Sequence, residues 1–187
     1  QLATVGLSAS ITAIGRCAFC YTGIRQMTVP TGVKRIEQET FYDCNNLKKV
    51  SLPDGITYIG TSAFSQCDSL ETVNIPAQVE TLENYAFYGN SLKTSPIVIP
   101  ATCKTIGREV FNNNYLVSSI TFNEGLESIG YQAFRNCRKV KEVKLPESIT
   151  SIGQDAFCRI DSLREFTFPS NIKEEAKIGR ASCRERV

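Results

Sequence analysis

Residues 54–76 read DGITYIGTSAFSQCDSLETVNIP, and residues 124–146 read EGLESIGYQAFRNCRKVKEVKLP. Allowing aliphatic residues to replace one another, both segments follow the pattern I-x-x-I-G-x-x-A-F-x-x-C-x-x-L-x-x-V-x-I-P. The pattern recurs along the chain, and its phenylalanines stand 22 to 24 residues apart at Phe19, Phe41, Phe64, Phe87, Phe111, Phe134 and Phe157. A fixed period of this length is typical of a solenoid, in which each repeat forms one coil and contacts only its neighbours.

The period divides the chain into seven full repeats of about 23 residues over residues 9–169. Residues 1–8 fit the end of a preceding repeat, through Leu2, Val5 and Leu7, and residues 170–177 fit the beginning of an eighth. We therefore expect one stack of coils whose two ends lack capping repeats. Open ends of this kind expose apolar edges, so end-to-end self-association is possible.

Each part of the repeat has its own predicted structure. The alternating residues of L-x-x-V-x-I favour a strand with one buried face, and proline ends it because proline has no N–H for a ladder. The glycine after the second isoleucine, such as Gly60, is expected to form a bend at positive φ. The Ala-Phe pair is expected in a short helical turn that points inward. Since parallel strands lie about 4.8 Å apart, each phenylalanine should lie on that of the next coil as a continuous ladder.

This repeat resembles the BspA-type leucine-rich repeat, which occurs in surface proteins of bacteria and some protozoa. The resemblance covers residues 2 to about 174. It implies an α/β leucine-rich-repeat solenoid, with a parallel β-stack on one face and short helical turns on the opposite side. It also implies location at the cell surface or secretion, and a role in adhesion. The chain departs from the pattern at an insertion in residues 92–100, at Asn123 in place of proline and at Cys103 in place of the first isoleucine.

Composition argues against catalysis and against several kinds of partner. The chain has no histidine, which removes the most frequent general base and zinc ligand. Its carboxylates are scattered, and it has no glycine-rich phosphate loop, so we predict neither an enzyme nor a cofactor or metal. No apolar run is long enough for membrane insertion of this segment. A structural spacer or an intracellular interaction scaffold remains an alternative to an adhesive role.

The cysteines do not indicate a chemical site. Cys17 and Cys20 form the one C-x-x-C, without the second pair or βαβ context that zinc or redox chemistry would need. Cys44, Cys67 and Cys137 share one repeat position, where we expect small apolar side chains that face inward. A disulfide between the neighbouring Cys44 and Cys67 is possible. Free thiols are preferred because other repeats place Asn90, Asn114 or Ile160 at this position.

The candidate binding surface is the outward face of the predicted strands. The residue between the last valine and isoleucine of each repeat is, in order, Gly6, Thr28, Ser51, Asn74, Val98, Thr121, Lys144 and Thr167. Such a surface is flat and polar, and it suits an extended extracellular protein or glycan better than a small molecule in a pocket. Solubility and the preference of threonine for strands explain the same residues without any ligand.

A row of basic residues is expected beside this surface. Arg25, Lys48, Lys141 and Arg164 share one repeat position. The row is interrupted by Glu71, Ser95 and Ser118, and it is offset by the adjacent Glu142 and Glu165. These cations are candidates for steering a partner toward the strand face.

The last ten residues, 178–187, read IGRASCRERV, which matches one frame of a common sequencing adapter. Our hypothesis is that they are not native, and the alternative is a genuine basic tail. They contain three arginines and one glutamate, so the net charge of +2 falls to zero without them. A nucleic-acid partner is therefore not predicted from the charge of the chain.

Overall fold

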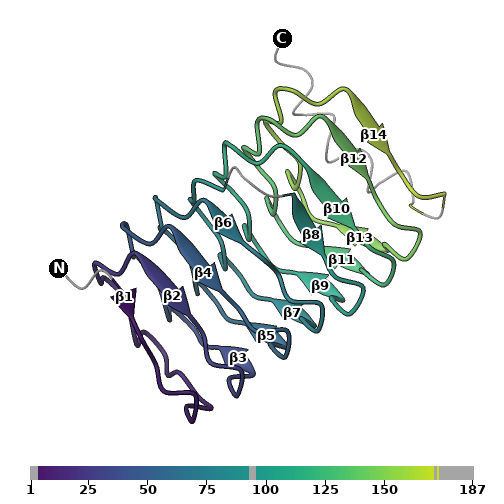
Figure 1. Ribbon diagram of the computed structural model, residues 1–187. Coiled ribbons are helices and arrows are strands. Elements are labelled where there is room, and N and C mark those ends of the chain that lie inside the picture. The colour runs from purple at the N-terminus through teal and green to yellow at the C-terminus, as the bar shows by residue number, and fades with distance from the viewer. Residues whose placement is uncertain (1–3, 93–95, 171, 173–187) are drawn as a thin grey trace.

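The described part of the chain forms a stack of coils that follow one another in sequence order (Figure 1). This computed structural model describes residues 4–92, 96–170 and 172. The predicted tail, residues 178–187, lies outside the described residues. No described residue belongs to a helix that could cross a membrane.

One side of the stack is formed by the L-x-x-V-x-I segments. Its parallel strands are β1 (Thr4–Val5), β2 (Gln26–Thr28), β4 (Lys49–Ser51), β6 (Thr72–Val73), β8 (Ile97–Ile99), β10 (Ile120–Phe122), β12 (Glu142–Lys144) and β14 (Glu165–Thr167). We call their outward side the strand face. The register follows the repeat, so that Val50 lies between Met27 and Val73. The row forms three separate sheets, β1-β2-β4-β6, β8-β10 and β12-β14.

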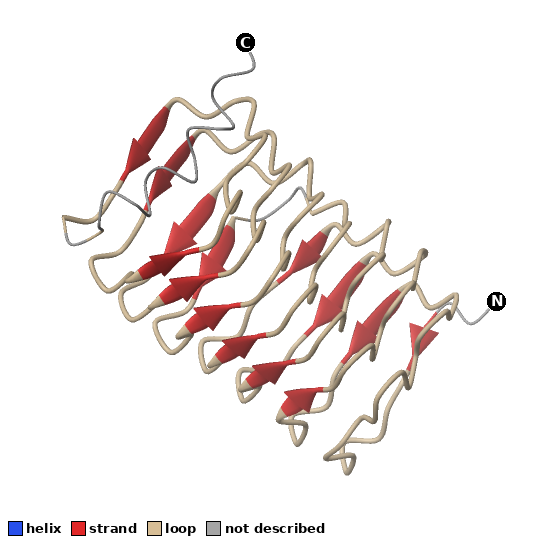
Figure 2. Ribbon diagram, turned by 180° about the vertical axis from the view of Figure 1, so that it is seen from behind, coloured by secondary structure: helices blue, strands red, loops and turns tan. Residues whose placement is uncertain are grey.

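A second row of strands, which the sequence analysis did not predict, follows each first isoleucine. It consists of β3 (Arg35–Ile36), β5 (Tyr58–Ile59), β7 (Thr81–Leu82), β9 (Thr105–Ile106), β11 (Ser128–Ile129) and β13 (Ser151–Ile152). These strands form one uninterrupted six-stranded sheet, which we call the lateral sheet (Figure 2). The I-x-x-I segment therefore builds a strand in its own right.

The third side consists of turns, and the predicted short helical turns are wrong: Figure 2 shows no helix in the described part of the chain. Each coil places two residues four positions apart at positive φ, as at Ser62 (55°) and Gln66 (60°). A residue in this conformation interrupts a right-handed helix. The N–H of Ala63 donates within the turn to the Gly60 carbonyl, whereas that of Phe64 donates to Ala86 in the next coil. Hydrogen bonds between coils thus replace those of a helix.

The glycine after the second isoleucine has a different role from the one predicted. Positive φ occurs among the described glycines only at Gly89 and Gly125, so the expected left-handed bend is wrong. A Cβ atom added to Gly130 would lie 2.5 Å from the carbonyl carbon of Gly107 in the preceding coil. Glycine is needed there because the two backbones approach closely. Other coils have Glu37 and Glu83 at this position, so the close approach is not required in every coil.

The phenylalanines of the repeat form a column through the interior. Adjacent rings are stacked with centroids 5.1–5.4 Å apart and interplanar angles of 1–14°. The five central rings, from Phe41 to Phe134, have no exposed surface, whereas the terminal Phe19 is only partly buried. The column lies in the interior, enclosed by the three sides of the stack, and the coils therefore share one hydrophobic core.

Candidate functional site

The structure exposes the outward residues that the repeat predicts on the strand face. Thr28, Ser51, Asn74, Thr121, Lys144 and Thr167 are exposed, and so is Val98. Register places Thr28 beside Ser51, Val98 beside Thr121 and Lys144 beside Thr167. Because the row of strands is broken into three sheets, these residues form three groups and not one continuous ladder.

A second outward position on the same face was missed by the sequence analysis. It lies two residues earlier along the chain and includes Gln26, Lys49, Thr72, Ser119, Glu142 and Glu165. The alternation of side chains along a strand was the signal that could have revealed it. Glu142 and Glu165 are direct neighbours in the register of β12 and β14, so this end of the strand face carries two adjacent carboxylates.

The four predicted basic residues lie beside the strand face in two pairs. The N–H of Lys48 donates to the Arg25 carbonyl, and that of Arg164 donates to the Lys141 carbonyl. All four side chains are exposed. Within the described residues none of them forms an ion pair, whereas cations elsewhere do, as in Arg16–Glu39 and Arg138–Asp161. Their charge is therefore available to a partner.

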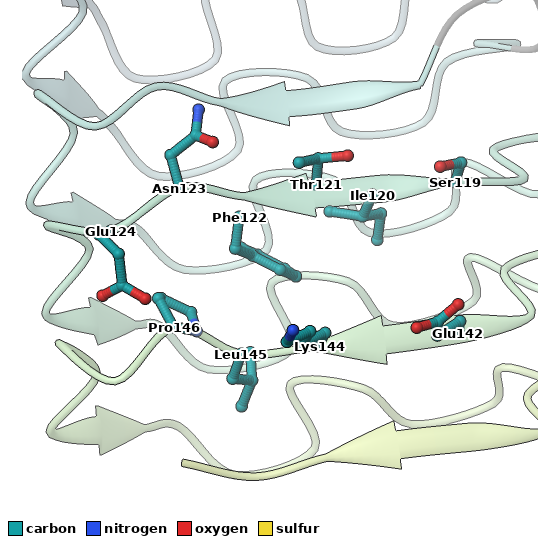
Figure 3. Close-up of a pocket in the computed structure, with 10 residues that line it drawn as sticks. All are labelled: Ser119, Ile120, Thr121, Phe122, Asn123, Glu124, Glu142, Lys144, Leu145 and Pro146. Atoms are coloured by element: carbon teal, nitrogen blue, oxygen red, sulfur yellow. The ribbon is translucent and has the colours of Figure 1, made fainter.

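A shallow groove of about 470 Å³ interrupts the strand face between β10 and β12 (Figure 3). Ser119, which precedes β10, and Thr121 and Phe122 of β10 line one side of it, and β12 contributes Glu142 and Lys144. No backbone hydrogen bond joins these two strands, both of which are fully described. The expectation of a uniformly flat face is therefore wrong at this position.

Phe122, the last residue of β10, and Asn123, which follows it, account for the groove. The ring of Phe122 occupies a position that holds an aliphatic residue in most repeats, and it meets the rings of Phe134 and Phe157 edge-on at 5.4 and 6.3 Å. Asn123 replaces the usual proline, and its N–H donates to the Ile99 carbonyl in the preceding coil at 3.3 Å. The bulk of the Phe122 ring on the inner side of the strand favours separation of β10 from β12. The hydrogen bond from Asn123 toward the coil of β8 has the same effect.

The cysteines differ from expectation in two respects. Cys17 and Cys20, for which no role was predicted, form a disulfide with their Cα atoms 4.8 Å apart. Cys44 and Cys67 are free and buried, as preferred. They are more than apolar fillers, because their Sγ atoms donate to the carbonyls of Phe19 and Phe41 in the preceding coils at 2.9 and 3.0 Å.

The free thiols are unsuited to nucleophilic chemistry. Burial raises the pKa of Cys44, Cys67 and Cys137, and it raises the pKa of Cys103 to about 11. A thiolate is the reactive form, so these side chains are inert at neutral pH. Within residues 4–92, 96–170 and 172, no group of three potential metal ligands comes together.

Comparisons with known proteins agree on the architecture. A leucine-rich repeat protein from Bacteroides ovatus has a crystal structure similar to this one, with a TM-score of 0.82 and 24% sequence identity. The match covers 91% of this chain and 46% of that protein, so the chain spans about half of the length of this relative. The Treponema pallidum leucine-rich repeat protein is similar with a TM-score of 0.71 and 22% identity, covering 86% of this chain and 84% of that one.

A third similar structure is a leucine-rich repeat protein from Eubacterium ventriosum, with a TM-score of 0.61, 21% identity and coverage of 86% and 53%. At these identities the likeness shows the fold alone. No curated protein is similar enough in sequence to count as a relative. The model of the BspA type leucine-rich repeat region matches six copies over residues 1–93 and 90–178, which together include nearly the whole chain. The chain therefore belongs to the BspA-type leucine-rich repeat family.

Proposed function

We propose that this chain is a non-enzymatic, ligand-binding region of a larger cell-surface protein, and that it binds an extended protein segment through the strand face. The observation that carries the proposal is the groove between β10 and β12, where two neighbouring strands expose backbone groups that do not pair with each other. Backbone N–H and C=O groups require partners, and those at an open groove can take them from a ligand.

An extended polypeptide is the ligand that fits this groove best. The lining residues follow β10 and β12 along their lengths, so a bound segment would run beside both strands (Figure 3). A peptide in this conformation offers alternating N–H and C=O groups, as in other cases of strand addition. Glu142 and Lys144 project beside the groove and would select the charges of the partner.

Location at the cell surface and an adhesive role are part of the same proposal. They are supported by membership of a repeat family that occurs in surface proteins. The exposed Arg25, Lys48, Lys141 and Arg164 would steer an acidic part of the partner toward the strand face. A spacer that holds another domain away from the cell would not need the groove.

The test is a binding screen of the full chain against extracellular-matrix proteins by biolayer interferometry. Thr121→Arg places a long side chain at the groove, and it should weaken binding at least tenfold. Thr28→Arg is the matched control, because Thr28 has the same repeat position on the continuous part of the strand face. Charge reversal at Lys48 or Lys141 should lower the association rate and its salt dependence more than the dissociation rate.

The result could contradict the proposal in two ways. Equal effects of Thr121→Arg and Thr28→Arg would show that the groove is not the contact. Loss of binding on substitution of the outward Thr105 in the lateral sheet, with the strand-face variants unaffected, would place the ligand on another side. If none of the proteins binds, the spacer function is supported instead.

A further inference from the structure

A second groove, of about 370 Å³, lies on the turn side of the stack, away from the strand face. Its walls come from three successive coils and carry Gln66, Asp68, Tyr88, Ser91, Asn113 and Tyr115. All six side chains offer hydrogen-bonding groups. The repeat pattern does not indicate this site, because these residues differ in type from coil to coil and are brought together only by the stacking of three coils.

The groove exists because the middle coil has a glycine where its neighbours have an amide. Gln66, Gly89 and Asn113 occupy the same repeat position, and all three have positive φ, at 60°, 69° and 64°. The Gln66 side chain lies across the bare Gly89, 3.6 Å from where a Cβ atom would stand. The missing side chain at Gly89 therefore leaves part of the space that the groove occupies.

Hydrogen bonds hold one wall of the groove in place. Asn113 donates from Nδ2 to the Tyr88 hydroxyl at 2.8 Å, and its Oδ1 accepts from the Tyr115 hydroxyl at 3.1 Å. The same Oδ1 accepts from Nδ2 of Asn136, a residue only 7% exposed, at 2.7 Å. Arg138 lies 5.0 Å from the centre of the Tyr115 ring and restrains it further. A rigid wall of this kind loses little entropy when a ligand binds.

The remaining groups are free to bind a ligand. Among the described residues, the side chains of Gln66, Asp68 and Ser91 have no hydrogen-bond or ion-pair partner. Tyr88 accepts a hydrogen bond from Asn113, so its own O–H remains available as a donor. Tyr115 is 45% exposed and presents a large aromatic surface at the rim. The groove thus combines a carboxylate, an amide and hydroxyl groups with one aromatic ring.

We propose that this groove binds a neutral sugar unit of a glycan, independently of the strand face. Sugars present closely spaced hydroxyl groups that both donate and accept, which matches an amide, a carboxylate and hydroxyls within one small site. The apolar side of a sugar ring can pack on the Tyr115 ring. Asp68 disfavours anionic sugars and phosphates by charge repulsion. The lining lacks an aliphatic pocket that could anchor a peptide side chain.

The experiment uses the full chain and a panel of neutral oligosaccharides of glucose, mannose, galactose and N-acetylglucosamine, observed by saturation-transfer-difference NMR. At least one of them should bind the wild-type protein. Gly89→Asn fills the hollow with the residue that Asn113 and Asn136 already present at this repeat position and backbone conformation, so the fold should be kept. We expect binding at least tenfold weaker. Tyr115→Ala should also weaken it.

Arg159→Asn is the matched control, since it introduces the same residue at the same repeat position and positive φ in a coil without the groove. It should leave sugar binding unchanged, as should Thr121→Arg on the strand face. Failure of every oligosaccharide to bind, or equal binding by Gly89→Asn and wild type, would overturn the proposal. Because Gly89→Asn should not alter binding of a protein partner, the two proposals can fail separately.

Discussion

The two rows of strands in this molecule come from the same coils, yet only one of them is continuous. The lateral sheet joins six strands from β3 to β13 without interruption, whereas within the described residues the strand face has no pairing between β6 and β8 or between β10 and β12. The repeat of residues 77–100 is one residue longer than most, but β7 and β9 still pair with Thr81 opposite Thr105. The extra length is therefore absorbed on the strand-face side of the coil.

The difference shows that the continuity of a sheet depends on the residues at the contact between neighbouring coils more than on the length of its strands. The lateral strands have only two residues each, but four of the six are directly followed by a glycine at which the backbones of adjacent coils come close, namely Gly60, Gly107, Gly130 and Gly153. The strands of the strand face have up to three residues, yet β10 and β12 do not pair beside Phe122, whose ring packs edge-on against Phe134. The regular side maintains the stack, and the interrupted side has the space for a ligand.

The largest expected effect comes from removing the column on which both rows rest. Phe64→Ala should destabilise the protein by about 3–5 kcal/mol, because a fully buried ring is lost and a cavity remains. The partly exposed Phe19 provides the matched control, and Phe19→Ala should cost clearly less. Denaturant melts give both values. A loss below about 1 kcal/mol for Phe64→Ala would mean that the column does not hold the coils together.

A smaller effect should follow from separating two coils within the lateral sheet. Gly130→Ala places a Cβ atom 2.5 Å from the Gly107 backbone, and the clash should cost about 3 kcal/mol, the upper part of the usual range for overpacking. Gly15 has the same repeat position with no atom within 4 Å, so Gly15→Ala should be nearly neutral. Thermal melts of the two variants should differ, and equal melting temperatures would show that glycine is not required for the close approach.

Alkaline pH tests whether the core beside the lateral sheet stays closed. Burial raises the pKa of Cys103 from 9.0 to about 11, so the unfolded state loses its proton first as pH rises. The contribution of the Cys103 thiol to the free energy of unfolding is fully present below pH 9. Between pH 9 and pH 11 the free energy of unfolding should fall by about 2 kcal/mol because of this group. Comparison with Cys103→Val isolates this contribution from those of other groups. Identical pH profiles would mean that water reaches the thiol.

Hydrogen exchange can compare the two rows directly in the unmodified protein. Backbone amides of β10 and β12, which lie on the two sides of the break, should on average exchange faster than those of the lateral strands β7, β9 and β11. The reason is that the groove leaves part of their hydrogen bonding to solvent. Equal protection would indicate that β10 and β12 pair in solution and that the groove closes.

The smallest effect is expected for the basic residues beside the strand face. Lys48→Glu and Lys141→Glu should change stability by less than about 0.5 kcal/mol, because neither exposed side chain forms an ion pair within the described chain. Arg16→Glu, which reverses one member of the Arg16–Glu39 pair, is the control that should cost more. A substantial loss of stability for the lysine variants would assign them a structural role and weaken the case for a binding surface.

Much of the candidate strand face could be predicted from the sequence, but its shape could not. The outward residues Thr28, Ser51 and Thr121 follow from the alternation of side chains along a strand, which is a local property. The groove beside Thr121 depends on how Phe122 packs against rings from two later coils. The sugar-binding groove proposed at Gly89 likewise needs side chains from three coils, and no single repeat reveals it.

The sequence by itself determined the period of the repeat, the family and the identity of the ring that each coil contributes to the core. Translation from coil to coil places like residues together, so the period alone brings Phe41, Phe64 and Phe87 into one column. Only the tertiary structure decided that the I-x-x-I segment is a strand and that the Ala-Phe turn is not a helix. In both segments the decisive partners are backbone groups of the neighbouring coil, as when Phe64 donates to Ala86, and the sequence of one coil contains no information about how closely the next one lies.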